Sequence, residues 1–388
     1  MTHHVMNTYG RLPVRIVRGQ SCTLYDEAGR EYLDLVAGIA VCNLGHAHPS
    51  VVAALQNQSS QLFHCSNLYA IPQQETLAAL IVENSFDAEV FFCNSGAEAN
   101  EAAIKLARKH CNSNGSRGPH IITCEGSFHG RTLATLAATG QTRFRQGFDP
   151  IPRGFSTVPY GDSDALKEAI TDEVGAVMLE PIQGEGGVRV PPLGYLRRVR
   201  ELCDATGVLM ILDEVQTGLA RTGKLFGYLH EGIEPDIMTL AKALGNGFPV
   251  GAMIARRRVA ASFGPGTHAT TFGGNPLAMA CSHATLTTIL DQNIAGTARE
   301  KGRYLTEKLE SLMVAHPGIR EVRGRGLMVG VEFDHDVSFL PIAGIEHGIL
   351  LNVIQGTILR LVPPLVISFE ELDRAIETIH ALLTEKGL

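Results

Sequence analysis

Short, continuously apolar segments alternate with helix-forming segments through the middle of the chain. Strands that are apolar along their whole length are buried on both faces, and their alternation with helices is typical of a mainly parallel sheet covered on both sides. Residues 97–110 and 195–205 have the pattern of covering helices. We therefore predict an α/β protein whose central sheet contains residues 89–93, 121–124, 174–179, 208–212, 237–240 and 250–254.

The two ends of the chain depart from this alternation. Residues 14–17, 22–25 and 31–35 form short pieces separated by turns, which predicts a small antiparallel meander. A long helical stretch over residues 276–314 leads into shorter strands and helices, and the total of 388 residues exceeds one small module. We predict three parts: an N-terminal segment that joins a small domain (1–50), a large α/β domain (51–280) and a C-terminal α+β domain (281–388).

Two adjacent acids, Asp213 and Glu214, directly follow the most strand-like segment, residues 208–212. Ligands of α/β proteins bind at the carboxyl ends of parallel strands, so these acids are candidates for a functional role. Acids in this position also cap a following helix or lie in solvent. This segment by itself leaves both interpretations open.

A lysine, Lys242, lies within an apolar segment just before the Gly-rich turn at residues 245–247. A buried ammonium group is costly and titrates low, which suits a lysine that forms a Schiff base. The alternative is a lysine that extends from a strand end into solvent.

A third feature is the Ser95-Gly96 step at the start of the helix predicted over residues 97–110. Free backbone N–H groups, a hydroxyl and the positive end of the helix dipole form the outline of a phosphate site. Ser95 could equally cap the helix in a capping box with Glu98. Together, the three features provide what pyridoxal phosphate requires: an anion site, a carboxylate for the pyridine nitrogen and an imine-forming lysine.

Nine stretches, which include the three features above, are distributed over practically the whole chain and occur in the same order in a known family. In these stretches the chain resembles the class III aminotransferases of the acetylornithine aminotransferase group. They are residues 38–41, 45–49, 95–100, 127–132, 179–187, 212–218, 239–242, 271–276 and 360–365. The resemblance implies the fold-type-I pyridoxal-phosphate architecture, with a large domain, a smaller α+β domain and a mainly parallel mixed sheet covered by helices. It also implies a homodimer whose active sites lie at the interface.

The resemblance further implies roles for the matching residues. Lys242 would hold the cofactor as a Schiff base and then shuttle a proton, while Asp213 would pair with the pyridinium nitrogen so that the ring accepts electrons. Gln216 would hydrogen-bond the phenolic oxygen. Val215 and Phe128 would pack on the two ring faces. The phosphate would be held by Ser95, Gly96 and Ala97 and by Thr271 of the partner subunit.

A dicarboxylate substrate is also implied. Arg131 and Arg360 suit the two carboxylates of 2-oxoglutarate and glutamate. Glu185 would mask Arg360 while the amino donor, which has one free α-carboxylate, is bound. The implied reaction belongs to arginine biosynthesis: the δ-amino group of N2-acetylornithine passes to 2-oxoglutarate and gives N-acetylglutamate 5-semialdehyde and glutamate.

Several alternatives stay open at this point. Ornithine, succinylornithine, N-succinyl-diaminopimelate and 4-aminobutyrate are alternative donors. Aminomutase or decarboxylase chemistry on the same fold, and the fold kept without turnover, are alternative functions.

The chain departs from the family pattern at two places. Leu219-Ala220 stands where the family usually has a second glycine before an arginine, here Arg221, and this predicts a slightly stiffer loop. Cys42-Asn43 replaces the usual Asn-Ala beside the substrate entrance, and this difference concerns side-chain specificity more than the chemistry.

Composition excludes several other classes of protein. The formal charge of −7, without a long basic run, argues against nucleic-acid or anionic-membrane partners. No apolar stretch is long enough to span a membrane, and the first eleven residues lack the apolar core of a signal peptide, so we expect a cytoplasmic protein.

The eight cysteines contain no C-x-x-C pair and are predicted to be buried, reduced thiols. His46 and His48 lack a nearby set of further ligands, so no metal site is predicted.

Overall fold

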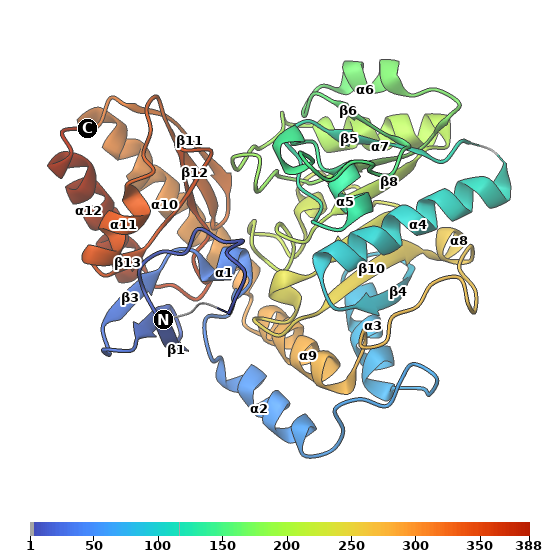
Figure 1. The fold of residues 1–388 in the computed structure, drawn as a ribbon, viewed down its shortest axis with the longest axis horizontal. Coiled ribbons are helices and arrows are strands. Elements are labelled where there is room, and N and C mark those ends of the chain that lie inside the picture. Colours follow the sequence, from blue (N-terminus) through green and yellow to red (C-terminus); the bar gives the residue numbers. More distant parts are fainter. Residues whose placement is uncertain (1–3, 116) are drawn as a thin grey trace.

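The computed structural model describes residues 4–115 and 117–388, and its centre is a seven-stranded sheet (Figure 1). Five neighbouring strands are parallel, whereas β10 runs antiparallel to both β9 and β4. The predicted mainly parallel sheet is therefore confirmed. In spatial order the strands are β4 (Ala88–Cys93), β10 (Gly251–Arg256), β9 (Ile237–Leu240), β8 (Leu209–Asp213), β7 (Val174–Leu179), β5 (His120–Cys124) and β6 (Phe155–Val158).

Both faces of this sheet are buried because its strands carry apolar side chains in both directions. Along β8, Met210 and Leu212 belong to one apolar core, whereas Leu209 and Ile211 belong to a second one on the other face. The second core is closed mainly by α4 (Gly96–Asn114). The first is closed by several helices, including α3 (Pro72–Glu83), α6 (Ser163–Ala169), α7 (Tyr195–Thr206) and α9 (Pro276–Asp291).

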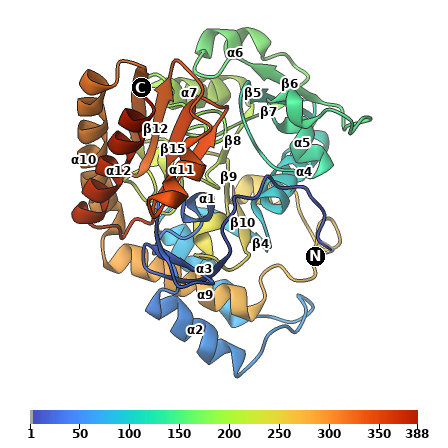
Figure 2. The same ribbon diagram turned by 60° about the vertical axis from the view of Figure 1, so that its left-hand side comes forward.

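Two smaller sheets lie beside the large one (Figure 2). The first confirms the predicted meander, although its first strand begins at Ile16 and not at Val14, and a fourth strand from the C-terminal part pairs parallel with β3. It consists of β1 (Ile16–Gln20), β2 (Thr23–Asp26), β3 (Glu31–Asp34) and β13 (Ile349–Leu350). The second consists of β11 (Ile319–Arg325), β12 (Met328–Phe333), β15 (Ile358–Leu361) and β14 (Asn352–Ile354).

The helical stretch predicted over residues 276–314 is divided into two helices. It consists of α9, which ends at Asp291, and α10 (Ile294–Ala315). Asn293 between them has a left-handed backbone with φ 48°, which ends one helix and turns the chain into the next. Asparagine is one of the few non-glycine residues that adopt this conformation readily.

The other helices are short or peripheral. They are α1 (Ala37–Ala40), α2 (Pro49–Ser59), α5 (Leu133–Ala138), α8 (Arg257–Ala260), α11 (Leu340–Glu346) and α12 (Phe369–Glu385), with 3₁₀ turns η1 (Thr142–Phe144), η2 (Gly227–His230) and η3 (Lys242–Leu244). No helix within residues 4–115 and 117–388 is long and apolar enough to cross a membrane.

The pairing of β3 with β13 supports the prediction that the N-terminal segment joins the small domain, and the three domain boundaries stay predictions. Residues 1–3 of that predicted segment lie outside the described residues.

All eight cysteines are free thiols, but the expectation that all are buried is wrong for two of them. Cys42 and Cys65 are half-buried.

Candidate active site

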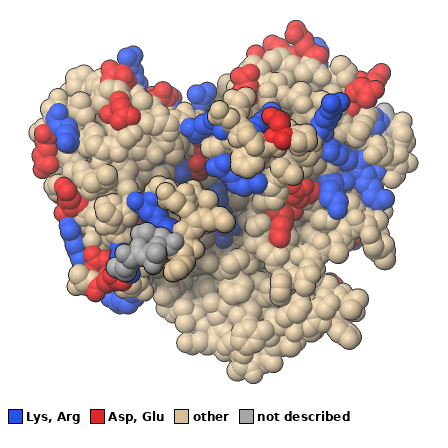
Figure 3. Space-filling model, in the orientation of Figure 1, with Lys and Arg blue, Asp and Glu red and all other residues tan. Residues whose placement is uncertain are grey.

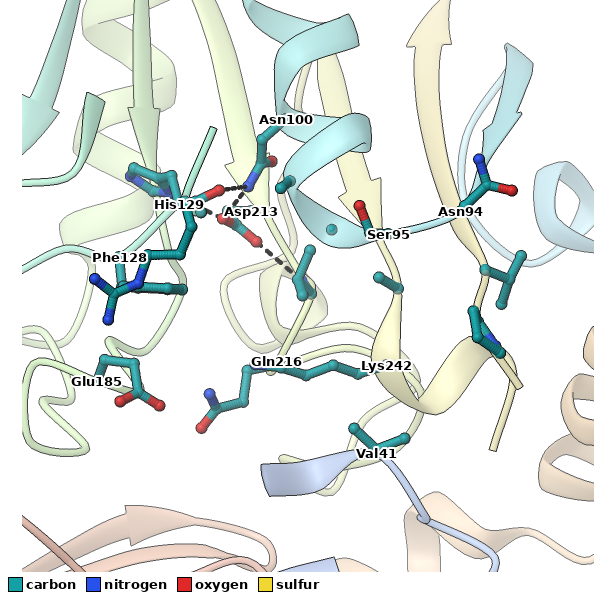
Figure 4. Close-up of a pocket in the computed structure, with 18 of the residues that line it drawn as sticks. Val41, Asn94, Ser95, Asn100, Phe128, His129, Glu185, Asp213, Gln216 and Lys242 are labelled. Carbon is teal, nitrogen blue, oxygen red and sulfur yellow. Dashed lines mark hydrogen bonds and ion pairs between the residues drawn. The ribbon is translucent and has the colours of Figure 1, made fainter. Parts of the chain in front are cut away.

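The residues predicted to bind the cofactor converge at one edge of the seven-stranded sheet. The parallel strands β8 and β9 end there, and so does β4, because β10 is antiparallel to both of its neighbours. The loops that follow these strands surround a cavity of about 400 Å³ (Figure 4). The predicted site residues that line it are Ser95, Gly96, Ala97, Phe128, Arg131, Glu185, Asp213, Val215, Gln216 and Lys242.

The start of α4 forms one end of the cavity. Ser95 caps this helix, since its hydroxyl accepts a hydrogen bond from the Glu98 N–H at 3.2 Å, and the Glu98 carboxylate accepts one from the Asn94 N–H at 2.5 Å. This cap does not compete with anion binding, because the first N–H groups of a helix have no partner within the helix. A Cβ atom at Gly96 would lie 2.9 Å from Cγ1 of Val215, so only glycine fits against the floor of the cavity.

Asp213 lies at the centre of a buried hydrogen-bond network. Its Oδ2 accepts from Asn100 Nδ2 at 2.7 Å and from His129 Nδ1 at 2.8 Å, and its Oδ1 accepts from the Val215 N–H at 3.0 Å. Asn100 is held in turn by Thr239, whose hydroxyl donates to its Oδ1 at 2.7 Å. The carboxylate is 4% exposed, and its position is fixed by three hydrogen bonds, one of which comes from a side chain that Thr239 holds in place.

Asn100 and His129 were not singled out by the sequence analysis. Both lie in stretches that match the family, and this was the available signal, because other polar and charged residues flank each of them. His129 Nε2 is buried and has no partner within the described residues. Only the fold places the two side chains against the same carboxylate.

The neighbouring acid, Glu214, has a different role. It faces away from the cavity and accepts hydrogen bonds from the Gly227 N–H at 2.9 Å, the Tyr228 N–H at 2.8 Å and the Thr217 hydroxyl at 2.5 Å. Burial raises its pKa to about 7. Of the two candidate acids, Asp213 therefore belongs to the cavity and Glu214 caps η2.

Lys242 follows β9 and lines the cavity between Asp213 and Glu185 (Figure 4). Its backbone is left-handed, with φ 44°, a conformation that is strained for a lysine and that is found preferentially at functional sites. Burial lowers the pKa of the amine, and the charge of Glu185 opposes this shift in part. The structure thus gives Lys242 the desolvated surroundings that favour a neutral, nucleophilic amine.

Glu185 and Arg360 form an ion pair at the other side of the cavity. Arg360 is only 1% exposed, and its Nε and Nη2 donate to Asn352 Oδ1 at 3.0 and 2.7 Å. Asn352 lies directly opposite Arg360 in the pairing of β14 with β15. Burial alone would raise the pKa of Glu185, but the adjacent Arg360 charge outweighs burial and the pKa lies below its usual range.

The loop that carries Glu185 is also tied to the C-terminal sheet. Gln355 Nε2 donates to the Glu185 carbonyl at 3.3 Å, and Arg323 donates to the Gly187 carbonyl from Nε at 3.0 Å and Nη2 at 2.7 Å. These anchors and Asn352 could not be predicted from the sequence, because each acts across a sequence separation that no local pattern reports.

The two remaining predicted residues lie in different environments. Arg131 is exposed and its guanidinium lies over the ring of Phe144, with Cζ 4.0 Å from the centroid, and near that of Phe128 at 5.4 Å. Thr271 does not line the cavity formed by this chain. It is exposed and lines a separate surface pocket.

The cavity, the acid and the desolvated lysine agree with comparisons to known proteins. A model of the family "Aminotransferase class-III" matches residues 5–383. The chain belongs to the class III aminotransferases. Their cofactor is pyridoxal phosphate, so the predicted cofactor and enzyme class are confirmed.

Individual relatives of this aminotransferase match over nearly their full length. An acetylornithine aminotransferase of Caldanaerobacter subterraneus is 50% identical, with 98% of each chain covered. One of Methanothermobacter thermautotrophicus is 46% identical, with 98% of this chain and 96% of the relative covered. Among solved structures, the ornithine aminotransferase of Toxoplasma gondii has a TM-score of 0.96 at 37% identity, with coverages of 99% and 94%. An acetylornithine aminotransferase of Elizabethkingia anophelis has a TM-score of 0.89 at 35% identity, with coverages of 98% and 96%.

The cavity of this aminotransferase fits pyridoxal phosphate. Gln216 Oε1 is buried without a partner within the described residues, which leaves an acceptor free for a ligand hydroxyl. A Cβ atom at Gly184 would lie 2.5 Å from the Gln216 side chain, so only glycine at this position leaves room for that amide. Apolar side chains, an unpaired amide and the fixed Asp213 carboxylate thus surround one space.

The first departure from the family pattern has a structural counterpart in the aminotransferase. Leu219 and Ala220 both have left-handed backbones, with φ 54° and 72°, a conformation that glycine adopts at lower cost. The next residue, Arg221, is fully buried and donates to the carbonyls of Leu327 at 2.8 Å and Pro363 at 2.6 Å. The loop after Gln216 is therefore anchored to the C-terminal part of the chain despite its strained entry.

Proposed function

We propose that this enzyme transfers the δ-amino group of N2-acetylornithine to 2-oxoglutarate, giving N-acetylglutamate 5-semialdehyde and glutamate in arginine biosynthesis. The observation that carries the proposal is the ion pair between the buried Arg360 and Glu185, because Glu185 lines the same cavity as Lys242. Relatives that are 46–50% identical and match over nearly their full length bear the name acetylornithine aminotransferase. A panel of donors with 2-oxoglutarate, read as glutamate formation and compared by kcat/KM, tests this choice.

The cofactor supplies an electron sink that stabilises negative charge on the substrate carbon. We assign its phosphate to the start of α4, at Ser95, Gly96 and Ala97, because an anion is favoured at a helix N-terminus. Asp213 holds the proton on the pyridine nitrogen, and its hydrogen bonds from Asn100 and His129 keep the carboxylate oriented toward the cavity.

Three further residues complete the assignment of the cofactor site. Val215 and Phe128 both line the cavity and would pack against the two ring faces. Gln216 would hydrogen-bond the phenolic oxygen through its side-chain amide. The position of these three residues orients the ring with respect to Lys242.

Lys242 acts as both nucleophile and proton carrier in this proposal. Its Nζ is neutral more readily than that of a surface lysine because burial lowers the pKa of the amine. A neutral Nζ would accept the proton from the substrate carbon, while the bound cofactor would supply the electron sink for that step. A neutral amine also lowers the free-energy cost of excluding water from the cavity, because no unhydrated positive charge is then buried there.

We assign the two substrate carboxylates of 2-oxoglutarate and glutamate to Arg131 and Arg360. Both side chains can pair with carboxylates in a bidentate manner. In this face of the molecule, Lys and Arg side chains gather around the hollow between the two parts of the protein (Figure 3). An anionic substrate is therefore attracted toward the entrance.

Glu185 determines which substrate the cavity accepts. While it is paired with Arg360, it cancels the charge that a second carboxylate would need, and this state suits a donor with one free carboxylate. When Glu185 moves away, Arg360 is free for the distal carboxylate of glutamate. Asn352 holds the guanidinium in place in both states.

Replacement of Glu185 by glutamine tests this switch. We expect kcat/KM for the acetylated donor to fall about tenfold relative to that for glutamate, a change of about 1.4 kcal/mol, because glutamine cannot cancel the charge of Arg360. Single-turnover kinetics of each half-reaction measures the ratio. Equal changes in both half-reactions would show that Glu185 does not discriminate between the substrates.

We propose a homodimer in which Thr271 completes the phosphate site of the partner subunit. Thr271 is exposed, and an apolar patch surrounds it: Leu62, Phe63, Leu68, Tyr69 and Phe272 are 43–87% exposed. The two segments of the patch are held together, since Asn67 Nδ2 donates to the Gly273 carbonyl at 2.9 Å. Few charged side chains appear over α2 and the loop after it (Figure 3). Such a surface supports association with a second copy.

Replacement of Thr271 by alanine is expected to weaken cofactor binding by about tenfold or more, because a hydrogen bond to a charged group contributes about 1.5–3 kcal/mol. Titration of the apoenzyme with pyridoxal phosphate measures this affinity, and sedimentation measures the mass. Thr267→Ala, in an exposed turn nearby, is the matched control. A monomeric protein, or unchanged affinity in a dimer, would contradict the shared site.

The same panel of donors distinguishes N2-acetylornithine from the alternative donors. Preference for ornithine, succinylornithine, N-succinyl-diaminopimelate or 4-aminobutyrate would change the donor and leave the aminotransferase chemistry intact. Release of CO₂, or amino migration without glutamate, would instead indicate decarboxylase or aminomutase chemistry.

We also propose a cytoplasmic location, which the eight free cysteines support.

A further inference from the structure

The 3₁₀ turn η1 carries an aromatic side chain, Phe144, that lies outside the apolar cores. Phe144 is half-buried and belongs to none of the three cores formed by the described residues. Its ring meets the ring of Phe128 edge to face, with the centroids 5.8 Å apart and the ring planes at 84°. Phe128 lines the cavity (Figure 4). Phe144 therefore supports one wall of the cavity from outside.

The guanidinium of Arg131 lies on this aromatic pair. Its Cζ is 4.0 Å from the centroid of Phe144 and 5.4 Å from that of Phe128. Within residues 4–115 and 117–388, no carboxylate or other acceptor pairs with this guanidinium, so the two rings are what position it. A cation is attracted to the face of an aromatic ring, and a guanidinium in this position keeps its N–H groups available for a ligand.

The backbone beside Arg131 is fixed independently of its side chain. Glu101 Oε1 accepts hydrogen bonds from the Thr132 hydroxyl at 2.5 Å and from the Ala134 N–H at 3.2 Å. The freedom that remains to Arg131 is that of its long side chain, and the contact with Phe144 restricts it.

Phe144 is itself held by anchors on both sides of it in the chain. Gln141 Nε2 donates to the Gly126 carbonyl at 3.0 Å, in the segment that precedes the cofactor-stacking ring. Arg145 Nη2 donates to the Ala137 carbonyl at 2.8 Å, in the last turn of α5. The ring is thus mounted on a turn that is tied to two other parts of the cavity wall, and it can act as a fixed support.

We propose that Phe144 is a positioning residue that holds the guanidinium of Arg131 ready for the carboxylate of the substrate. This inference rests on the proposed function, in which Arg131 pairs with a substrate carboxylate. An arginine that is already ordered loses less conformational entropy when the substrate binds, so the contact with Phe144 raises the affinity for the carboxylate. Because Phe144 also contacts Phe128, one aromatic pair aligns the substrate carboxylate with the cofactor ring.

Arg143 is the other cation on the same ring. Its Cζ lies 4.7 Å from the centroid of Phe144, and its Nη2 donates to Gln141 Oε1 at 3.0 Å. Arg131 lines the cavity, whereas Arg143 is not among the described residues that do so. A ring that served Arg143 alone would not influence the binding of substrate, so the two roles can be separated by experiment.

Titration of the holoenzyme with glutarate, a dicarboxylate without an amino or keto group, measures carboxylate binding apart from turnover. We expect Phe144→Leu to raise the Kd of glutarate about tenfold, because leucine offers the guanidinium no ring face. Phe144→Tyr keeps the ring and is expected to retain the affinity. Phe148→Leu, at an exposed aromatic residue shortly after η1, is the matched control and is expected to leave the Kd unchanged.

Steady-state kinetics supplies a second readout. Phe144→Leu is expected to raise KM for 2-oxoglutarate with little change in kcat, since Lys242 and Asp213 are not in contact with η1. The absorption of the lysine-bound cofactor is expected to be unchanged, which distinguishes this effect from a disturbed cofactor site. A fall in kcat with unchanged KM would contradict the positioning role.

Arg131→Gln separates this inference from the proposed function. If it weakens glutarate binding and Phe144→Leu does not, the inference is overturned and the assignment of Arg131 stands. If Arg131→Gln leaves the Kd unchanged, the carboxylate assignment fails, and the role of Phe144 fails with it. A loss of affinity in Arg143→Gln equal to that in Phe144→Leu would also overturn the inference.

The double variant is the most direct test of the dependence of one residue on the other. With both Arg131→Gln and Phe144→Leu in place, glutarate is expected to bind no more weakly than with Arg131→Gln alone, because Phe144 acts through Arg131. Additive losses would show that Phe144 influences binding by another route.

Discussion

Replacement of Lys242 by alanine lowers the rate of amino transfer by about 10⁴-fold or more, because positioned proton transfer alone contributes about 10²–10⁴-fold and the covalent attachment is lost as well. The structure supplies the reason for so large an effect. The amine lies in the cavity between Asp213 and Glu185, and burial lowers its pKa. We expect the visible absorption of the lysine-bound cofactor to disappear together with activity.

Two measurements distinguish this loss from misfolding. Circular dichroism is expected to be unchanged, because the alanine removes a side chain that borders an open cavity. Lys224→Ala, at an exposed position on a neighbouring loop, serves as the matched control and is expected to retain full activity. A Lys242→Ala enzyme that kept both the absorption band and turnover would show that another group holds the cofactor.

Replacement of Asp213 by asparagine is expected to lower kcat by about 10³-fold. Two unit charges about 4 Å apart interact by about 4 kcal/mol at an effective dielectric constant of about 20, and a loss of that size in the transition state corresponds to about 10³-fold in rate. Asparagine keeps the shape of the side chain but cannot hold the ring nitrogen protonated. The measurement is kcat for both half-reactions, together with the cofactor dissociation constant.

The neighbouring residue is an internal control for this prediction. Glu214→Gln removes a buried carboxylate of the same loop that accepts hydrogen bonds from Gly227 and Tyr228 and does not line the cavity. We expect it to reduce the free energy of unfolding by about 1–3 kcal/mol with little change in kcat. If Glu214→Gln lowered kcat as much as Asp213→Asn, the assignment of the two acids would have to be reversed.

The central sheet was predictable because its physical cause is local. Strand β7 is apolar at every position and β8 at every position before Asp213, and this pattern is visible in the sequence without knowledge of the rest of the fold. The Ser95 and Lys242 positions were visible for the same reason, since each interrupts a regular pattern at a strand–helix junction. The break between α9 and α10 was missed because it depends on the backbone of one asparagine, Asn293.

Residues that act across long distances along the chain could not be predicted from local patterns. Asn100 and His129 meet at Asp213 although more than eighty residues separate them from it. Asn352 becomes significant only when the register of two strands places it opposite Arg360. The roles of the adjacent acids Asp213 and Glu214 also required the fold, because a sequence does not report which way each side chain points.

The origin of Arg360 in a separate sheet has an evolutionary consequence. Asp213 ends strand β8 of the seven-stranded sheet and Lys242 follows the neighbouring strand β9, whereas Arg360 and its support Asn352 belong to the C-terminal sheet. Under the proposed assignment of Arg360 to a substrate carboxylate, mutations in the C-terminal sheet can change the preferred amino compound while Lys242 and Asp213 keep their positions. Paralogues of such an enzyme can diverge toward new metabolites by altering one structural unit, with the reaction chemistry inherited intact from the other.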